Sequence, residues 1–262
     1  KLRGEGAPGV FTGKPLSLGG SLGRTEATGR GTVIVVREAA RHLGIPLQGA
    51  RVAIQGMGNA GTYAGRMLEA MGAVIVAASD SGGGVVDPNG LPIAELIAHK
   101  QATGSVKGFR GLRSASQREV LTADCDILIP AALENQINGE VASDIKAKIV
   151  AEAANGPTTP EGDSVLSRRG VFVIPDILAS AGGVTVSYFE WVQNLSGFYW
   201  TEDEVHARLE QKMVRAFQEV LAVAQRKGAP MRTAAYMNAL LRIADGLRAR
   251  GLLRAPMPKL VG

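Results

Sequence analysis

Residues 51–61 read RVAIQGMGNAG, a short apolar run followed by three glycines in the spacing Gly-x-Gly-x-x-Gly. The apolar run predicts a buried strand, and the residues after the glycines, up to about residue 71, predict a helix. A strand, a glycine-rich turn and a helix in this order are typical of dinucleotide-binding folds. Gly56 permits the tight turn, Gly58 lets backbone N–H groups reach a pyrophosphate, and Gly61 lets the helix pack closely on the sheet.

Asp80 ends the next apolar run and lies 19 residues after Gly61. In dinucleotide-binding folds, an acidic residue about 20 positions beyond the glycines accepts hydrogen bonds from the adenosine ribose. A carboxylate there also repels a 2′-phosphate, and no arginine or lysine follows Asp80 before Lys100. We therefore predict NAD as the cofactor, with NADP as the less favoured alternative. A solvated turn aspartate is the alternative interpretation of Asp80.

Apolar runs alternate with helical patterns over the first part of the chain. Four further apolar runs predict strands, at residues 73–78, 127–129, 149–151 and 171–174. Helical patterns lie at residues 32–43, 92–102 and 162–169, whereas residues 80–90 are rich in turn formers. After residue 175 only helical patterns remain, at residues 181–195, 201–227 and 230–250. This order predicts an α/β fold with a Rossmann-like, doubly wound, mostly parallel sheet followed by C-terminal helices.

Composition excludes several classes of protein. Of the 262 residues, 45% are hydrophobic and 20% are charged, so the chain can bury enough apolar surface to fold. The net charge is +5, but the arginines of the C-terminal helices lack interleaved aromatic residues, so we predict no nucleic-acid partner. No run approaches the roughly 18 apolar residues of a membrane helix, and no signal-peptide core is present. We expect a cytoplasmic protein with no membrane partner.

Cysteine and histidine give no sign of a disulfide or a metal site. Cys125 is the single cysteine, and its place before an apolar run predicts a small core residue. His42, His99 and His206 lie far apart on predicted helices, so we predict no metal-ligand cluster.

Seven short segments between residues 8 and 191 together form one recognisable pattern. They are PGVFTGKP at residues 8–15, LGGSLGR at 18–24, ATGRG at 27–31, QGMGN at 55–59, PAALENQI at 130–137, AANGPTT at 153–159 and GGVTVSYFEW at 182–191. Together they resemble the hexameric-type glutamate dehydrogenases of the glutamate/leucine/phenylalanine/valine dehydrogenase family, specifically their cofactor-binding portion.

The resemblance implies reversible oxidative deamination of L-glutamate to 2-oxoglutarate and ammonia, with hydride passing to the nicotinamide. It implies that Thr28, near the nicotinamide amide, and Asn59 contact the cofactor, and that Asn155 contacts it on the nicotinamide-ribose side. Ser187 matches the serine that hydrogen-bonds the side-chain carboxylate of the substrate. Val184 matches the residue that packs on the substrate methylenes.

The family's catalytic lysine and aspartate, and a lysine that holds the substrate α-carboxylate, belong to a preceding domain that no segment here matches. We therefore expect no catalytic residue in this chain, which starts with Lys1 and is expected to begin partway through a larger protein. Residues 1–31 would be an entrance segment from that domain, and residues 32–190 a Rossmann-like NAD-binding domain. Residues 191–262 would be helices returning toward it. The chain alone should bind NAD without oxidising glutamate, and the full-length protein should be a homo-hexamer.

Two other functions remain open. A sister amino-acid dehydrogenase would act on an apolar substrate, but an apolar side chain has no use for the hydroxyl of Ser187. A non-catalytic regulatory subunit of a glutamate dehydrogenase would keep the fold with little chemistry, and the retained glycine motif argues against it.

Overall fold

The computed structural model describes residues 7–253 and contains one seven-stranded sheet in the order β4-β3-β2-β1-β5-β6-β7. The parallel strands are β1 (Arg51–Gln55), β2 (Val74–Asp80), β5 (Ile127–Pro130), β6 (Ile149–Ala151) and β7 (Phe172–Ile174). Two antiparallel strands extend one edge, β3 (Gly83–Val86) and β4 (Ser114–Ala115). The predicted Rossmann-like, mostly parallel sheet is thereby confirmed.

Strand β3 lies inside the segment predicted to be turns, so that part of the prediction is wrong. Gly83 pairs with Asp80 across a tight reversal, and Val85 pairs with Ala78. A run of glycines has low strand propensity by itself. The hydrogen bonds offered by the edge of β2, together with the burial of Val85, outweigh that local preference.

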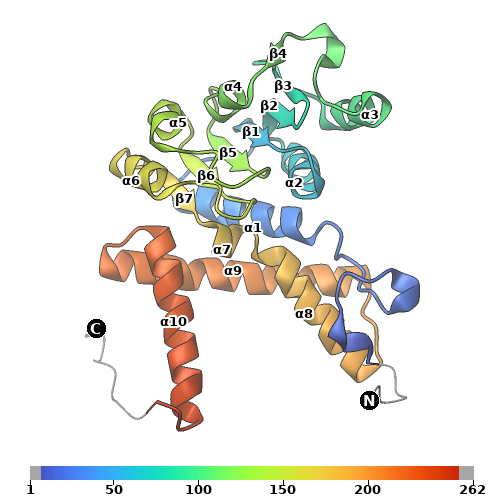
Figure 1. Ribbon diagram of the computed structural model, residues 1–262, viewed down its shortest axis with the longest axis vertical. Coiled ribbons are helices and arrows are strands. Elements are labelled where there is room, and N and C mark those ends of the chain that lie inside the picture. The colour runs from blue at the N-terminus through green and yellow to red at the C-terminus, as the bar shows by residue number, and fades with distance from the viewer. Residues whose placement is uncertain (1–6, 254–262) are drawn as a thin grey trace.

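The sheet separates two apolar cores because side chains alternate along each strand. In β1, Val52 and Ile54 belong to the larger core, whereas Ala53 faces the smaller one. Helices α1 (Ala27–His42), α2 (Asn59–Ala70) and α3 (Ile93–Thr103) contribute to the larger core. Helices α4 (Gln117–Leu121), α5 (Gly139–Asp144) and α6 (Pro160–Arg168) cover the other face (Figure 1). Helices on both faces make the sheet doubly wound.

Four C-terminal helices follow the sheet: α7 (Asp176–Ala179), α8 (Ala181–Ser196), α9 (Glu202–Lys227) and α10 (Met231–Ala249). Three short 3₁₀ helices complete the secondary structure of residues 7–253, at Pro8–Val10, Leu16–Leu18 and Phe109–Gly111. Figure 1 shows α9 passing beneath α1 and α10 pointing away from the sheet. No helix within the described part of the chain is long and apolar enough to cross a membrane.

Both predicted domain boundaries fall inside helices, at residues 31/32 within α1 and at residues 190/191 within α8. Helix α1 begins at Ala27, five residues before the predicted start at 32. The predicted start is late because Gly29 and Gly31 have low intrinsic helix propensity. These glycines allow close packing instead, because α1 lies against α2, α8 and α9. The two regions are therefore joined along a shared helix, and their division into domains stays a prediction.

Helices α1 and α8 cross with their backbones in contact. A Cβ atom added to Gly31 would lie 2.7 Å from Cα of Gly182. A Cβ atom added to Gly182 would lie 2.1 Å from the carbonyl oxygen of Ala27. Any larger residue at this crossing must push the helices apart.

We expect Gly182→Ala to lower the free energy of unfolding by about 1–3 kcal/mol, because the methyl group overlaps backbone atoms that cannot move independently. The matched control is Gly246→Ala in the interior of α10, where an added Cβ meets no atom within 4 Å. This control should raise stability by about 0.5–1 kcal/mol through the lower entropy of the unfolded chain. Urea denaturation of both variants measures the difference, and equal effects would contradict the close crossing.

Candidate functional site

The order of the strands reverses between β1 and β5. From β1 the chain first builds β2 on one side and later returns to place β5 on the other. In open α/β sheets the crevice at the carboxyl ends of two such strands is where ligands bind. The glycine motif follows β1 at this point, and residues 131–133 follow β5.

A pocket with a volume of about 540 Å³ occupies this crevice. Three predicted cofactor residues line it together, namely Gly56, Gly58 and Asp80. Its other walls come from the end of β1, from Lys100 on α3 and from residues 131–133 after β5. The fold therefore assembles these three predicted residues in one cavity.

The three glycines of the motif have different surroundings. Gly56 has φ +102°, and a Cβ atom there would lie 2.6 Å from the carbonyl oxygen of Ala131. A Cβ atom on Gly61 would lie 2.0 Å from the carbonyl oxygen of Gly56, so α2 can begin at this place only with glycine. Gly58 is exposed, and an added Cβ atom would meet nothing within 4 Å. The space beside Gly58 is thus open to a ligand at the N-terminus of α2.

Asp80 is buried and holds the turn that follows α3. Its Oδ1 accepts hydrogen bonds from the N–H of Gly82 (2.9 Å) and from Oγ of Ser105 (2.8 Å). Its Oδ2 accepts one from the N–H of Val106 at 2.8 Å. The alternative of a merely solvated turn residue does not describe this carboxylate. Whether it also accepts a ribose hydroxyl stays a prediction.

Lys100 lies beside Asp80 although 20 positions separate them. Its Nζ is 3.8 Å from Oδ2 of Asp80 and donates a hydrogen bond to the carbonyl oxygen of Met57 at 2.6 Å. The absence of arginine and lysine between residues 80 and 100 favours NAD, but the fold brings Lys100 itself to within 3.8 Å of Asp80. Helix α3 returns Lys100 to the pocket, where its charge partly offsets that of the carboxylate.

Two glutamines of the pocket were not found by sequence reasoning. The side chain of Gln55 is fully buried at the end of β1, and its Nε2 donates to Oε1 of Gln136 at 3.1 Å. The other amide oxygen, Oε1 of Gln55, has no hydrogen-bond partner among residues 7–253. A buried acceptor without a donor is costly unless water or a ligand supplies one. This orphan oxygen and the open position at Gly58 fit a polar ligand such as a dinucleotide.

The N-terminal end of α1 gathers three of the residues implied by the resemblance. Nδ2 of Asn59 donates to the carbonyl oxygen of Thr25 at 3.3 Å, which ties the start of α2 to this segment. Thr28 lies against α8, because a Cβ atom on Gly183 would be 2.5 Å from Oγ1 of Thr28. Ser187 reaches the same segment one helical turn further along α8.

Arg24 makes that last connection, since its Nε donates a hydrogen bond to Oγ of Ser187 at 2.9 Å. Arg24 lies within the segment LGGSLGR, but no local pattern reveals its role, because its partner is 163 positions away. Val184, on the same helix, exposes 69% of its surface. Arginine, a serine hydroxyl and an exposed apolar side chain together could contact a substrate with methylenes and a carboxylate.

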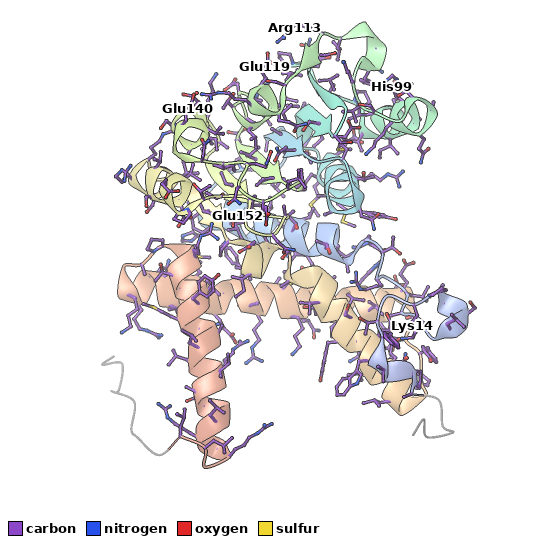
Figure 2. All side chains as sticks on the ribbon, viewed as in Figure 1. Lys14, His99, Arg113, Glu119, Glu140 and Glu152 are labelled. Atoms are coloured by element: carbon purple, nitrogen blue, oxygen red, sulfur yellow. The ribbon has the colours of Figure 1, made fainter. Side chains whose placement is uncertain are left out.

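Helix α8 is held in place by Lys14 of the entrance segment (Figure 2). The buried carboxylate of Glu190 accepts hydrogen bonds from the N–H of Gly13 at 2.8 Å and from Nζ of Lys14 at 2.5 Å. Burial alone raises the pKa of Glu190, but these hydrogen bonds outweigh it and hold the pKa below its ordinary value. The ion pair therefore anchors α8 three residues beyond Ser187.

Asn155 is exposed in the loop after β6, and the surrounding backbone is fixed from three sides. The N–H of Ala154 donates to the carbonyl oxygen of Pro130, and the N–H of Asn135 donates to that of Gly156, both at 2.9 Å. The N–H of Gly156 donates to Oδ2 of Asp176 at 2.8 Å. These bonds join the Asn155 loop to the loop after β5, which lines the pocket.

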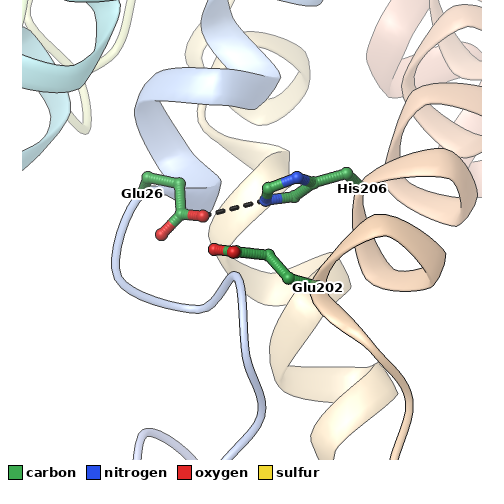
Figure 3. A group of neighbouring side chains, drawn as sticks. All are labelled: Glu26, Glu202 and His206. Carbon is green, nitrogen blue, oxygen red and sulfur yellow. Dashed lines mark hydrogen bonds and ion pairs between the residues drawn. The ribbon is translucent and has the colours of Figure 1, made fainter.

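Figure 3 shows a group of side chains that sequence reasoning did not foresee. Ligand atoms of Glu26, Glu202 and His206 lie within 4.8 Å of one another. Nε2 of His206 is 2.8 Å from Oε1 of Glu26. Burial raises the pKa of Glu26. The hydrogen bond with His206, a backbone hydrogen bond and the charge of Arg30 outweigh burial and hold the pKa below its ordinary value. The direct pair joins α9 to the start of α1.

Cys125 is buried, as predicted for a small core residue. Burial in the apolar interior raises the pKa of its thiol to about 12, so the thiol stays protonated at neutral pH. It is not a reactive nucleophile.

Comparison with known proteins places this geometry in a family. A family model described as Glutamate/Leucine/Phenylalanine/Valine dehydrogenase matches residues 19–251. The chain is 51% identical over 246 residues to the cryptic catabolic NAD-specific glutamate dehydrogenase of Bacillus subtilis, covering 94% of this chain and 57% of that protein. It is 47% identical over 256 residues to the NAD-specific glutamate dehydrogenase of Clostridioides difficile, covering 96% and 61%.

The fold agrees with these sequence matches. The crystal structure of hetero-hexameric glutamate dehydrogenase from Thermus thermophilus aligns with a TM-score of 0.87 and 38% identity, covering 94% of this chain and 58% of that chain. The chain thus spans about three fifths of the length of its relatives. Since the family model matches most of its length, the chain belongs to the glutamate/leucine/phenylalanine/valine dehydrogenase family.

Proposed function

We propose that this chain is the cofactor-binding part of a glutamate dehydrogenase that reversibly oxidises L-glutamate to 2-oxoglutarate and ammonia with NAD. One observation carries the proposal: the glycine-lined pocket and the Arg24–Ser187 pair are joined through the short segment 24–28. The proposed cofactor site and the proposed carboxylate-binding pair are thus connected through one short stretch of backbone. The relatives named NAD-specific glutamate dehydrogenases support the same reaction.

Residues in and near the pocket would each contact a different part of a bound dinucleotide. The first N–H groups of α2, beside Gly58, would bind the pyrophosphate, and the positive end of the helix dipole would favour its charge. Thr28, Asn59 and Asn155 would contact the cofactor nearer its nicotinamide. The bound nicotinamide supplies the hydride acceptor, while the protein groups orient it.

Preference for NAD rests on a balance of charges. The buried carboxylate of Asp80 repels a 2′-phosphate, but Lys100 at 3.8 Å offsets part of that repulsion. Because Asp80 keeps hydrogen bonds from Ser105 and Val106, its charge is also shared among several donors. We propose NAD as the preferred cofactor and expect NADP to be discriminated against but not excluded.

We expect the chain to bind NADH more tightly than NADPH. We also expect Gly58→Ala to weaken NADH binding about tenfold or more. The added methyl group meets no protein atom, so it should act only by occupying ligand space. Fluorescence titration measures the affinity, and thermal unfolding should show an unchanged melting temperature. Gly246→Ala, in α10 and outside the pocket, is the matched control and should leave the NADH affinity unchanged. Unchanged NADH affinity in Gly58→Ala would contradict the pyrophosphate site.

The substrate end of the site is built for a carboxylate. Ser187 offers a hydroxyl that already accepts a hydrogen bond from Arg24, so its own proton is directed away from the guanidinium. A second carboxylate on the substrate could accept from both groups. Val184 offers an apolar contact for the methylenes between the two carboxylates. This arrangement favours glutamate over the apolar substrate of a sister dehydrogenase.

In the full-length protein, we expect Ser187→Ala to raise the KM for glutamate at least about tenfold, because a hydrogen bond to a charged group contributes about 1.5–3 kcal/mol. The KM for NAD should change little, since Ser187 lies on the substrate side. Ser196→Ala on the same helix is the matched control, because its hydroxyl bonds to backbone groups of Gln193 and Phe198 close by in the chain. Steady-state kinetics that left the KM for glutamate unchanged would remove Ser187 from the substrate site.

We further propose that the 262-residue chain alone does not oxidise glutamate, because catalytic groups are expected in the part of the relatives that it does not match. Absorbance at the NADH wavelength should stay constant when the chain is incubated with NAD and glutamate. The full-length protein provides the positive control. Glutamate-dependent NADH formation by the chain alone would show that it carries its own catalytic groups.

The full-length protein is proposed to be a homo-hexamer. The Thermus thermophilus neighbour is described as hetero-hexameric, which keeps a second function in view, that of a non-catalytic regulatory subunit. Gly58, Arg24 and Ser187 favour the catalytic function, since a subunit without chemistry has no need for an open phosphate site beside a carboxylate-binding pair.

A further inference from the structure

A branched ion-pair network joins the C-terminal helix α10 to the loop that carries Asn155. Arg232, in the first turn of α10, places its guanidinium among three carboxylates from different elements. Its Nη2 donates to Oε1 of Glu152 at 2.6 Å, and its Nε donates to Oδ1 of Asp163 at 3.1 Å. Its Nη1 lies 3.5 Å from Oδ1 of Asp176.

Glu152 is the buried centre of this network. It follows β6 directly (Figure 2). Its side chain is 0% exposed. One carboxylate oxygen accepts from Arg232, and the other accepts from the N–H of Asp176 at 2.9 Å. Burying a carboxylate is unfavourable without such partners. Glu152 therefore fixes both the guanidinium and the start of α7.

Asp176 carries the connection to the cofactor side. Its Oδ2 accepts from the N–H of Gly156 at 2.8 Å, and its Oδ1 accepts from its neighbour Ile177 at 2.8 Å. Gly156 has φ +54° and directly follows Asn155. The path from α10 to the proposed nicotinamide-ribose contact therefore contains one guanidinium, one carboxylate and one backbone N–H.

We propose that Arg232 is a positioning residue for the nicotinamide half of the cofactor, acting through Asp176 and Glu152 on the loop of residues 153–156. This inference rests on the proposed function, since it concerns the same cofactor. Arg232 touches neither cofactor nor substrate. Its role is to hold the loop so that Asn155 meets the nicotinamide ribose without first paying an ordering cost.

Charge explains why arginine suits this position. Three carboxylates converge on one guanidinium, so its removal would leave like charges facing one another. Burial lowers the pKa of Arg232, but the hydrogen bond and the charge of Glu152, with Asp163, outweigh it and raise the pKa above its ordinary value. The planar fork of the guanidinium can bond several carboxylates at once, which a lysine ammonium does less well.

The test compares two ligands that differ only beyond the diphosphate. NADH contains the nicotinamide ribose and ring, whereas ADP lacks both. We expect Arg232→Gln to weaken NADH binding by the 262-residue chain about fivefold to tenfold and ADP binding less than twofold. The fluorescence enhancement of bound NADH should also fall, because it reports the surroundings of the ring. Arg232→Lys should restore part of the NADH affinity.

Arg248→Gln is the matched control, because Arg248 lies on the same helix and pairs with Asp245 at an exposed site. It should leave the affinities for NADH and for ADP unchanged.

Asp176→Asn provides a second variant if Arg232→Gln does not fold. Asparagine has one acceptor oxygen in place of two, so it cannot hold both Gly156 and Ile177, and it should also weaken NADH more than ADP.

The outcomes separate this inference from the proposed function. If the unmodified chain binds neither NADH nor ADP, the proposed cofactor function fails. If it binds both, and Arg232→Gln weakens both equally, Arg232 only supports the fold and the positioning role is overturned. If Arg232→Gln does not fold and Asp176→Asn leaves the ratio of the two affinities unchanged, the positioning role is also overturned.

Discussion

Close backbone contact along α1 is the constraint on which the rest of the structure depends. On one side of this helix, a Cβ atom on Gly29 would lie 2.6 Å from the carbonyl oxygen of Ala60 in α2. On the other side, Gly31 meets Gly182 of α8. Helix α1 is therefore in backbone contact with α2 on one side and with α8, which carries Ser187, on the other. Without glycine at these positions, α2, which borders the glycine-lined pocket, and α8, which carries Ser187, would lie further apart.

This shared helix connects the proposed cofactor site to the proposed substrate site. Asp80, Lys100 and Gly58 line the pocket beside the start of α2, and the Arg24–Ser187 hydrogen bond joins the segment before α1 to α8. Two ion pairs hold the outer elements, Lys14 with Glu190 for α8 and Arg232 with Glu152 for α10. In both pairs the carboxylate is fully buried, so the geometry is fixed more strongly than by an exposed pair.

Sequence patterns located most elements because local and tertiary preferences agree there. The runs that form β1, β5 and β6 are apolar on both faces, as buried parallel strands require. The failures occur where tertiary contacts override local preference. Strand β3 is stabilised by the edge of β2 despite its glycines, and α1 begins early because its glycines allow close packing. The small helices α4 and α5 are too short to show a clear period.

The sequence by itself determined the glycine motif, the acidic residue after it and the family pattern, because these depend on residue types at short, regular spacing. Only the tertiary structure decided which distant side chains meet. Arg24 with Ser187, Lys100 with Asp80, and Arg232 with Glu152 are pairs separated by 163, 20 and 80 positions. No local pattern encodes such pairs, since their energy depends on distances that exist only after the chain has folded.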